Sequence, residues 1–273
     1  MRHAAAAARE LRRSVRLIRI VLHLLRGVLI AHTLLGWGSR CSGGAARWRA
    51  AVAQHWSRGL CRILNLRISV RGERGSAPTL FVANHLSWLD IPCLSAVLGA
   101  DFVAKDEVAR WPLIGAMARR AGTMFLRRGD RFATDAISDQ MTWLLKRGRN
   151  VILFPEGTTG AGRSVGRFHS RLYQAALRTQ AQVQAVAVSY PHPSGVHPAA
   201  PFIGDDNLAR HLWTLLAEPS LDVTLTFCPA LTVANGPRRV VAEYTREQIV
   251  RALGLHAPLV QPDRIGSDYR QCS

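Results

Sequence analysis

The sequence predicts an α/β fold, a mixed, mostly parallel open sheet flanked by helices and preceded by an N-terminal amphipathic, membrane-associated helical segment. Short apolar runs alternate with longer stretches of helical period, and 273 residues suffice for one large core. The formal charge of +18 is concentrated near the N-terminus. We therefore expect a basic helical segment over 1–62, an α/β domain over 63–256 and a disordered tail over 257–273.

The N-terminal segment carries most of the charge excess. Residues 1–62 hold 12 Lys and Arg side chains against the single Glu10, so +11 of the total lies there. Such an excess indicates an anionic partner, either lipid or nucleic acid. Basic residues recur every three or four positions on one face of a predicted helix, and aliphatic residues fill the other face. The basic face comprises Arg12, Arg16, Arg19, His23 and Arg26, and the apolar face comprises Leu17, Ile18, Val21, Leu22, Leu24, Leu25, Val28 and Leu29.

This pattern favours a helix that lies in a membrane interface. Nucleic-acid-binding arms lack so much aliphatic surface, so we expect an anionic membrane surface as partner and no nucleic acid. Arg19 and Arg26 interrupt what a transmembrane span would need, about 20 apolar residues, and no signal-peptide cleavage site follows a short apolar core. A second basic stretch around Trp48 and Trp56 extends the same surface. The alternative is an ordinary amphipathic helix packed on the protein's own core.

From residue 66 onward the periodicity switches repeatedly between strand and helix. Because such alternation is typical of an open α/β sheet, we expect functional residues in the loops that follow the carboxyl ends of its strands. Strands are predicted over 66–70, 80–83, 102–104, 123–126, 151–154, 183–189 and 222–227. Helices are predicted over 87–98, 112–121, 132–146, 165–179, 205–216 and 238–253.

The segment from Thr79 to Asp90 organises the functional prediction. It starts as a strand, breaks at Asn84 and His85, and resumes as a helix for which Ser87 is a suitable N-cap. A histidine whose far ring nitrogen is bound by a carboxylate suits general-base catalysis. In a continuous helix the two side chains would lie about 140° apart, so we expect His85 in the turn, with Asp90 reaching back. Taken alone the pattern is common, and a turn histidine with a solvated aspartate is the alternative.

Three further stretches follow or join strand-like runs. Residues 122–128 end such a run with Arg127 and Arg128, residues 154–159 read Phe-Pro-Glu-Gly-Thr-Thr after an apolar run, and Lys105 opens a Lys-Asp-Glu stretch between the first motif and residue 122. In this order, over roughly residues 67–190, the four motifs resemble those of the 1-acylglycerol-3-phosphate acyltransferase (lysophospholipid acyltransferase) family.

The resemblance implies an O-acyltransferase. The acyl group would move from a thioester, with acyl carrier protein or coenzyme A as its carrier and co-substrate, to the free hydroxyl of a lysophospholipid, and no cofactor is expected. His85 would take the hydroxyl proton as general base, and Asp90 would orient His85. No covalent intermediate is needed, since Ser87 is not set in a G-x-S-x-G elbow. The leading acceptor is 1-acylglycerol-3-phosphate (lysophosphatidic acid), which gives phosphatidic acid.

Two alternatives to this acceptor and activity stay open. Another lyso-lipid, such as lyso-ornithine lipid, suits the same chemistry, because no residue proves a phosphate. A non-catalytic membrane-binding protein would keep the scaffold, but it has no need of both His85 and Asp90. We place the protein at the cytoplasmic face of the inner membrane, because its five cysteines are scattered without an export signal. They have no metal-like spacing, so no metal site is expected.

Further residues are expected to bind the substrate. Arg128 is the first candidate for the acceptor's phosphate, since a guanidinium group forms two parallel hydrogen bonds with it, and Lys105 is the second. Glu156 is expected to bind acceptor hydroxyls or to brace cationic residues, and Gly157 to permit a tight turn.

Two further members of the predicted substrate-binding set have structural roles as well. Asn84 is expected to shape the turn of the first motif, and Thr158, with Thr159, to cap the helix after the third.

The sequence departs from the family in two places. Ala185 stands where the fourth motif has a proline, which leaves the shape of that strand open. His169 stands where many relatives have a lysine, which leaves open a cationic contact in the helix after the third motif.

Overall fold

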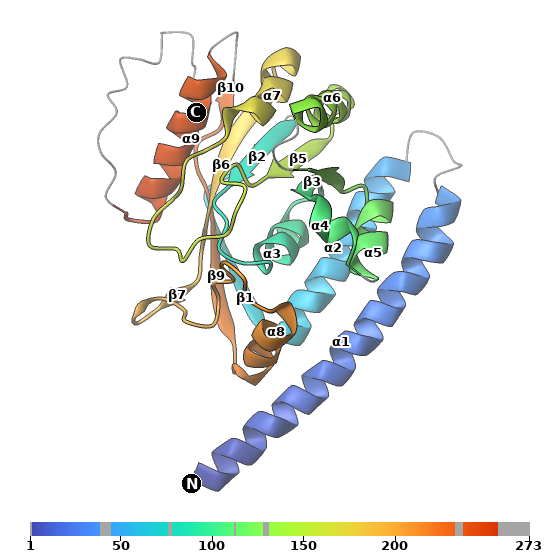
Figure 1. Ribbon diagram of the computed structural model, residues 1–273, viewed down its shortest axis with the longest axis vertical. Coiled ribbons are helices and arrows are strands. Elements are labelled where there is room, and N and C mark those ends of the chain that lie inside the picture. Colours follow the sequence, from blue (N-terminus) through green and yellow to red (C-terminus); the bar gives the residue numbers. More distant parts are fainter. Residues whose placement is uncertain are drawn as a thin grey trace.

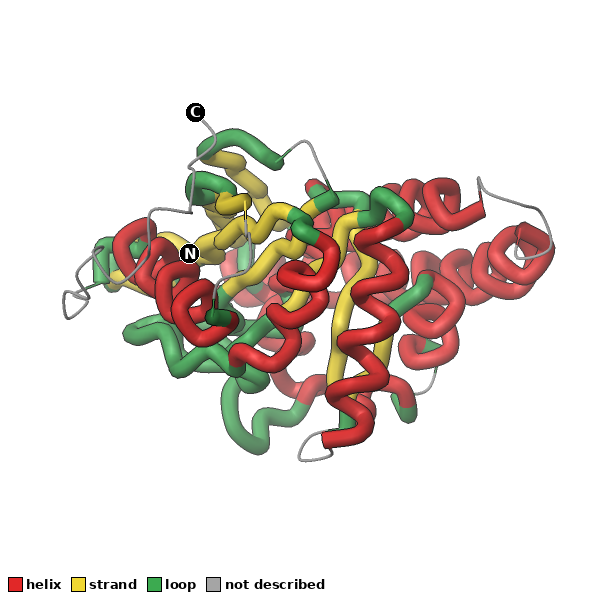
Figure 2. Tube along the Cα trace, turned by 90° about the horizontal axis from the view of Figure 1, so that it is seen from above, coloured by secondary structure: helices red, strands yellow, loops and turns green. Residues whose placement is uncertain are grey.

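The computed structural model describes residues 2–38, 45–75, 78–111, 113–127, 131–232 and 237–255. Three predictions lie outside these ranges: Arg128, the start of the second predicted helix at position 112, and the tail over 257–273. The described part confirms the predicted class, a mixed and mostly parallel sheet with helices on both faces and a helical N-terminal segment (Figure 1 and Figure 2).

The main sheet contains every predicted strand, with boundaries shifted slightly. Its strands run in the order β1-β9-β6-β2-β5-β3-β4, and β10 also pairs with β6. Neighbours in the described sheet are parallel, except where β9 and β10 pair with β6. The bounds are β1 Leu66–Arg71, β2 Thr79–Ala83, β3 Ala100–Lys105, β4 Met124–Leu126, β5 Asn150–Leu153, β6 Gln182–Ser189, β9 Leu221–Phe227 and β10 Leu231–Thr232, and a separate hairpin joins β7 Pro191–His192 to β8 Gly195–Val196.

The helices match the predicted ones in most places. They are α1 Arg2–Gly38, α2 Ala45–Leu64, α3 Asp90–Val97, α4 Asp106–Ala109, α5 Ile114–Ala121, α6 Arg131–Lys146, α7 Gln174–Thr179, α8 Leu208–Ala217 and α9 Arg238–Ala252, with a 3-10 helix η1 over Ser170–Tyr173. The helix predicted over 165–179 is wrong in its first part, because residues 165–169 form a loop. Val165 and Phe168 are buried from that loop and imitate helical spacing.

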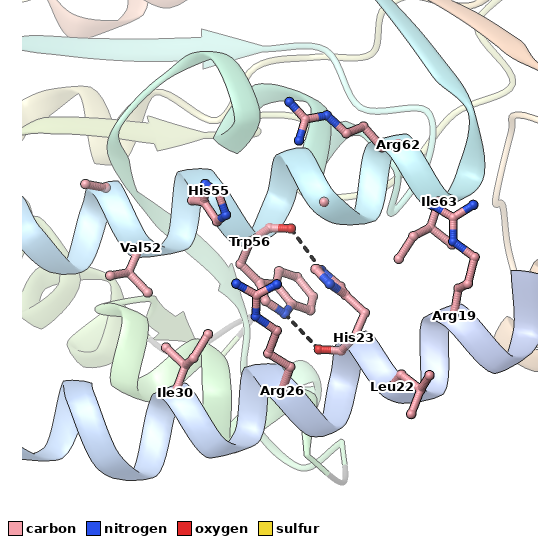
Figure 3. A pocket seen from close by; sticks show the side chains of 12 residues that line it. Arg19, Leu22, His23, Arg26, Ile30, Val52, His55, Trp56, Arg62 and Ile63 are labelled. Carbon is pink, nitrogen blue, oxygen red and sulfur yellow. Dashed lines mark hydrogen bonds between the residues drawn. The ribbon is translucent and has the colours of Figure 1, made fainter.

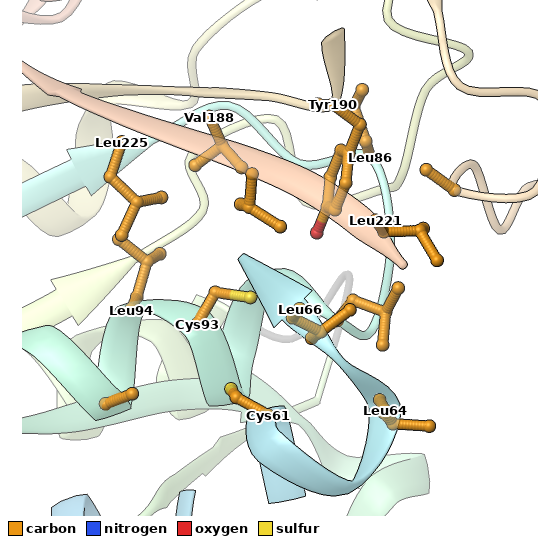
Figure 4. Packing of buried hydrophobic residues seen from close by; sticks show 14 of the residues in the cluster. Cys61, Leu64, Leu66, Leu86, Cys93, Leu94, Val188, Tyr190, Leu221 and Leu225 are labelled. Carbon is orange, nitrogen blue, oxygen red and sulfur yellow. The ribbon is translucent and has the colours of Figure 1, made fainter. Parts of the chain in front are cut away.

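Both faces of the sheet are covered. In β2, Phe81 and Ala83 pack on the side of α2, α3 and α8, whereas Leu80 and Val82 pack on the side of α6, α7 and α9. Successive side chains of a strand point to opposite faces, so a strand covered on both sides is apolar throughout. Figure 4 shows part of the first core, where Cys93 lies among buried leucines.

The two N-terminal helices pack side by side along one flank of the domain (Figure 1). Two glycines permit the close approach. A Cβ on Gly59 would lie 2.5 Å from Cε1 of His23, and one on Gly27 would lie 2.5 Å from Nε1 of Trp56. The rings of His23 and Trp56 stack with centroids 4.7 Å apart, and each side chain donates to the other residue's carbonyl.

α1 docks on the domain through arginines and exposes its apolar face. Arg16 is buried and donates to three backbone carbonyls where α8 ends, and Arg12 donates to the carbonyl of Ala217. Cations at that end complement the helix dipole. The alternative, an amphipathic helix packed on the protein's own core, holds only in part: Ile20 is buried in the core and Leu24 packs against it, but most of the predicted apolar face is exposed. The exposed apolar face comprises Leu11, Val15, Leu17, Ile18, Val21, Leu22, Leu25 and Leu29.

The length and polarity of the helices bear on how the chain could meet a membrane. Within the described ranges, no helix combines the length and the apolar character needed to cross one.

Candidate active site

The site forms where two central strands end side by side. β2 and β5 are parallel neighbours, with Val82 level with Leu153, so the residues that follow them leave the sheet at the same edge. His85 comes two residues after β2, and Glu156 comes three residues after β5. The predicted clustering of these motifs at the carboxyl ends of strands is therefore present.

His85 and Asp90 form a hydrogen-bonded pair across the turn that follows β2. The chain turns through residues 84–89, and α3 begins at Asp90, whose side chain points back. Nδ1 of His85 donates to Oδ2 of Asp90 at 2.8 Å. This is the geometry predicted from the five-residue separation. The alternative of a solvated aspartate is wrong, because Asp90 is fully buried.

Four donors hold the Asp90 carboxylate. Besides His85, the backbone N–H groups of Leu86 and Ser87 donate to Oδ2 at 2.7 and 2.9 Å, and the Tyr190 hydroxyl donates to Oδ1 at 2.5 Å. Burial raises the pKa of the Tyr190 phenol well above its usual range, and the nearby carboxylate raises it further. The phenol therefore stays protonated and donates. These charge-assisted bonds offset the cost of burying the carboxylate.

The imidazole of His85 is fixed in plane and in orientation. It stacks on Phe154 with ring centroids 3.9 Å apart and 13° between the planes. Its backbone N–H donates to Oε1 of Glu156 at 2.9 Å, and its carbonyl accepts from the N–H of Gly160 at 2.8 Å. Nδ1 is committed to Asp90, whereas Nε2 forms no hydrogen bond within the described structure. A neutral imidazole held in this tautomer can accept a proton at Nε2.

Glu156 ties the third motif to the first. Its second oxygen, Oε2, accepts from the N–H of Gly166 at 2.7 Å. Burial raises the pKa of the Glu156 carboxyl, and the hydrogen bonds from the N–H groups of Gly166 and His85 oppose that rise. Gly157 has φ of +66° and donates to the carbonyl of Phe154 at 3.0 Å, so a tight turn needs glycine there, as predicted.

Comparison with known proteins assigns the chain to a family. A family model described as Acyltransferase matches residues 67–189. The lyso-ornithine lipid O-acyltransferase of Pseudomonas aeruginosa is 41% identical over 211 residues, which are 77% of this chain and 81% of that protein. The chain belongs to the lysophospholipid acyltransferase family. The predicted resemblance is confirmed, and the protein is a lyso-lipid acyltransferase.

Two further comparisons agree with this assignment. The 1-acyl-sn-glycerol-3-phosphate acyltransferase of Neisseria meningitidis is 32% identical over 213 residues, which are 77% of this chain and 84% of that protein. The solved structure of the 1-acyl-sn-glycerophosphate (LPA) acyltransferase PlsC from Thermotoga maritima has the same fold, with a TM-score of 0.57 at 19% identity. The match covers 87% of this chain and 97% of that one.

Ser87 does not cap a helix in this acyltransferase, contrary to the prediction. It is fully buried, and its Oγ has no hydrogen-bond partner in the described structure. The N-cap position of α3 is Leu89, which forms no side-chain cap. The helix starts three residues later than predicted because the Asp90 carboxylate, rather than Ser87, binds the N–H groups of the turn.

Asn84 shapes the start of the turn in the acyltransferase. Its amide nitrogen donates to the carbonyl of Val188 at 2.9 Å, and its amide oxygen accepts from the N–H of Val188 at 2.8 Å. The side chain thus continues the pairing of β2 with β6 after the β2 backbone has left the sheet. These contacts support the turn-shaping role rather than contact with the acceptor.

Of the three other predicted substrate-binding residues, the structure describes two. Lys105 is half-buried at the end of β3, level with Leu126 of β4, so the motif that ends with Arg128 emerges beside it. Arg128 itself lies outside the described residues. Thr158 is exposed in the loop after β5 and caps no helix, and neither does Thr159, because the next helical turn begins at Ser170.

Two residues of the site had no role in the sequence-based prediction. They are Phe154, under the His85 ring, and Tyr190, behind Asp90. Tyr190 directly follows β6, which is parallel to β2, so it leaves the sheet at the same edge as His85. That position after a buried strand is the only sequence signal for Tyr190.

No cluster of three or more His, Cys, Asp and Glu side chains suited to a metal ion occurs among the residues described.

Proposed function

We propose that this acyltransferase moves the acyl group directly from a thioester to the lyso-lipid hydroxyl, with His85 as general base. The observation that carries this proposal is the His85–Asp90 pair, which engages Nδ1 at 2.8 Å and leaves Nε2 for the substrate. Nε2 takes the hydroxyl proton while the oxygen bonds to the thioester carbonyl carbon. As the C–S bond breaks, His85 returns the proton to the leaving thiolate, so the reaction is balanced without a cofactor.

The residues around the pair act by positioning it. Asp90 fixes the His85 tautomer and stabilises the imidazolium form during transfer. Tyr190 holds Asp90 from behind through its hydroxyl, and Phe154 fixes the plane of the His85 ring. Glu156 holds the His85 backbone, so its function in this proposal is to fix the site rather than to bind acceptor hydroxyls.

For the acceptor we propose a lyso-ornithine lipid. One relative named for that lipid is 41% identical to this chain, and one named for 1-acyl-sn-glycerol-3-phosphate is 32% identical. This reverses the order expected from the sequence. Lysophosphatidic acid is the second candidate, and Lys105 lies at the sheet edge. A cation there suits the phosphate of one acceptor or the carboxylate of the other, so Lys105 does not decide between them.

The acceptor is tested with a labelled acyl thioester and membranes that contain wild type or the His85→Ala variant. Lyso-ornithine lipid and lysophosphatidic acid are supplied as acceptors in parallel reactions. We expect label in ornithine lipid with the wild type alone. Label in phosphatidic acid alone would show that the proposed acceptor is wrong, while the proposed mechanism would stand. Transfer that does not depend on His85 would overturn the mechanism itself.

The Ser87 hydroxyl should be dispensable. Because it is buried without a partner, Ser87→Ala removes an unsatisfied polar group, and stability should stay equal or rise by about 1 kcal/mol. Acyl transfer should remain within about threefold of wild type, since direct transfer requires no serine nucleophile. Steady-state kinetics and thermal unfolding check both expectations. An acyl group trapped on Ser87 in the wild type, detected by mass spectrometry, would contradict direct transfer.

We also propose that the enzyme works at the cytoplasmic face of the inner membrane. The exposed apolar face of α1 supports this, because such a face covers itself by entering the lipid interface. Both candidate acyl carriers are cytoplasmic thioesters, so a site held at that surface meets donor and lipid acceptor together. Deletion of residues 1–40 should release the protein from anionic vesicles.

A further inference from the structure

A groove of about 600 Å³ lies between α1 and α2 (Figure 3). All of its lining residues belong to these two helices, so it shares no residue with the catalytic turn or with the loop after β5. The close approach that Gly59 allows brings His23 against Trp56, and their stacked rings form one wall. The groove is therefore a feature separate from the active site.

Three arginines are among the residues that line the groove. Arg19 and Arg26 extend from α1 and Arg62 lies on α2, all exposed to solvent. None of them forms an ion pair with a carboxylate within the described ranges. The one acidic residue of the N-terminal segment, Glu10, is bound to Arg13 at 2.6 Å. Such an uncompensated cluster favours an anion, and a phosphate matches several guanidinium groups at once.

The rest of the lining is apolar or neutral. Ile30, Val52 and Ile63 line the groove with Leu22, which also belongs to the exposed apolar face of α1. Burial lowers the pKa of His23, the hydrogen bond that its ring donates to the Trp56 carbonyl opposes this shift, and the neighbouring Arg26 and His55 lower the pKa further. The site thus combines three cations with a hydrocarbon wall that continues onto the apolar face of α1.

We propose that this groove binds one anionic phospholipid of the membrane. Its phosphate lies among Arg19, Arg26 and Arg62, and its acyl chains run past Leu22 along the apolar face of α1. Charge complementarity argues for an anionic rather than a zwitterionic lipid, and the apolar continuation argues for a lipid rather than a soluble phosphate. The proposal rests on the membrane association proposed above, but not on acyl transfer, because the bound lipid is retained and not converted.

Native mass spectrometry of the full-length, delipidated protein in non-ionic detergent tests the proposal. Dioleoylphosphatidylglycerol is the anionic probe, dioleoylphosphatidylcholine the zwitterionic one, and glycerol 3-phosphate the soluble one. We expect wild type to retain one phosphatidylglycerol, at least about tenfold more tightly than either other probe. The Arg19→Gln, Arg26→Gln, Arg62→Gln triple variant should lose that preference.

A second triple variant separates a site from bulk charge. Arg67→Gln, Arg71→Gln and Arg239→Gln remove the same charge from exposed positions on β1 and α9, and this control should bind phosphatidylglycerol like wild type. Equal weakening in both triple variants, equal retention of phosphatidylcholine, or tighter binding of glycerol 3-phosphate would each overturn the proposal. The same measurement on His85→Ala should give the wild-type result. Lipid binding is therefore tested independently of the proposed catalytic role of His85.

Discussion

Replacing His85 by alanine should reduce acyl transfer by about 10³-fold, because the hydroxyl of the acceptor would lose its general base. The fold should persist, since the ring packs on Phe154 at the edge of the sheet, and the backbone N–H to Glu156 is kept. Rates should be measured on the purified enzyme with saturating acyl thioester. Far-UV circular dichroism and vesicle flotation should match wild type.

His192 offers a matched control for this variant. It is exposed on the β7–β8 hairpin, so His192→Ala should leave the rate unchanged. Added imidazole should restore part of the activity of His85→Ala, because the space beside Phe154 can admit the missing ring. Turnover of His85→Ala at the wild-type rate, with an intact fold, would rule out general-base catalysis by this residue.

The sheet and the catalytic turn could be predicted because both depend on local patterns. Apolar runs bounded by polar turns identify β2 and β5, and parallel neighbours bring the residues after them to one edge. Side chains five residues apart in a continuous helix point in different directions, so His85 and Asp90 can form a hydrogen bond only if His85 lies in a turn before the helix. These conclusions needed no long-range information.

The remaining features depend on packing that periodicity does not encode. Val165 and Phe168 have helical spacing, yet they reach the core from a loop held by Glu156 through Gly166. For α1, the residues on each face follow from the sequence, but the side that docks depends on where α8 ends, since Arg16 binds the carbonyls there. Tyr190 meets Asp90 across a hundred residues, and no local pattern connects them.

Asp90→Asn should lower kcat by about 10³-fold while changing KM little, because it removes the charge that stabilises protonated His85 and keeps the shape of the turn. The amide oxygen can occupy the place of Oδ2 and accept from His85, Leu86 and Ser87. Asp90→Ala leaves all of these donors unsatisfied and should destabilise the protein by about 3 kcal/mol or more. Thermal unfolding and steady-state kinetics of the two variants distinguish charge from structure.

The Tyr190→Phe variant tests whether Tyr190 affects catalysis only through its hydrogen bond to the Asp90 carboxylate. Tyr190→Phe removes the 2.5 Å hydrogen bond to Oδ1 and should lower kcat by about tenfold in the wild type. In the Asp90→Asn background the charge that Tyr190 positions is gone, so the same substitution should cost less than about twofold. An equal loss in both backgrounds would mean that Tyr190 acts on the fold and not on the catalytic pair. The double-mutant cycle therefore measures, in one set of kinetics, how far the His85 base depends on a buried phenol behind its aspartate.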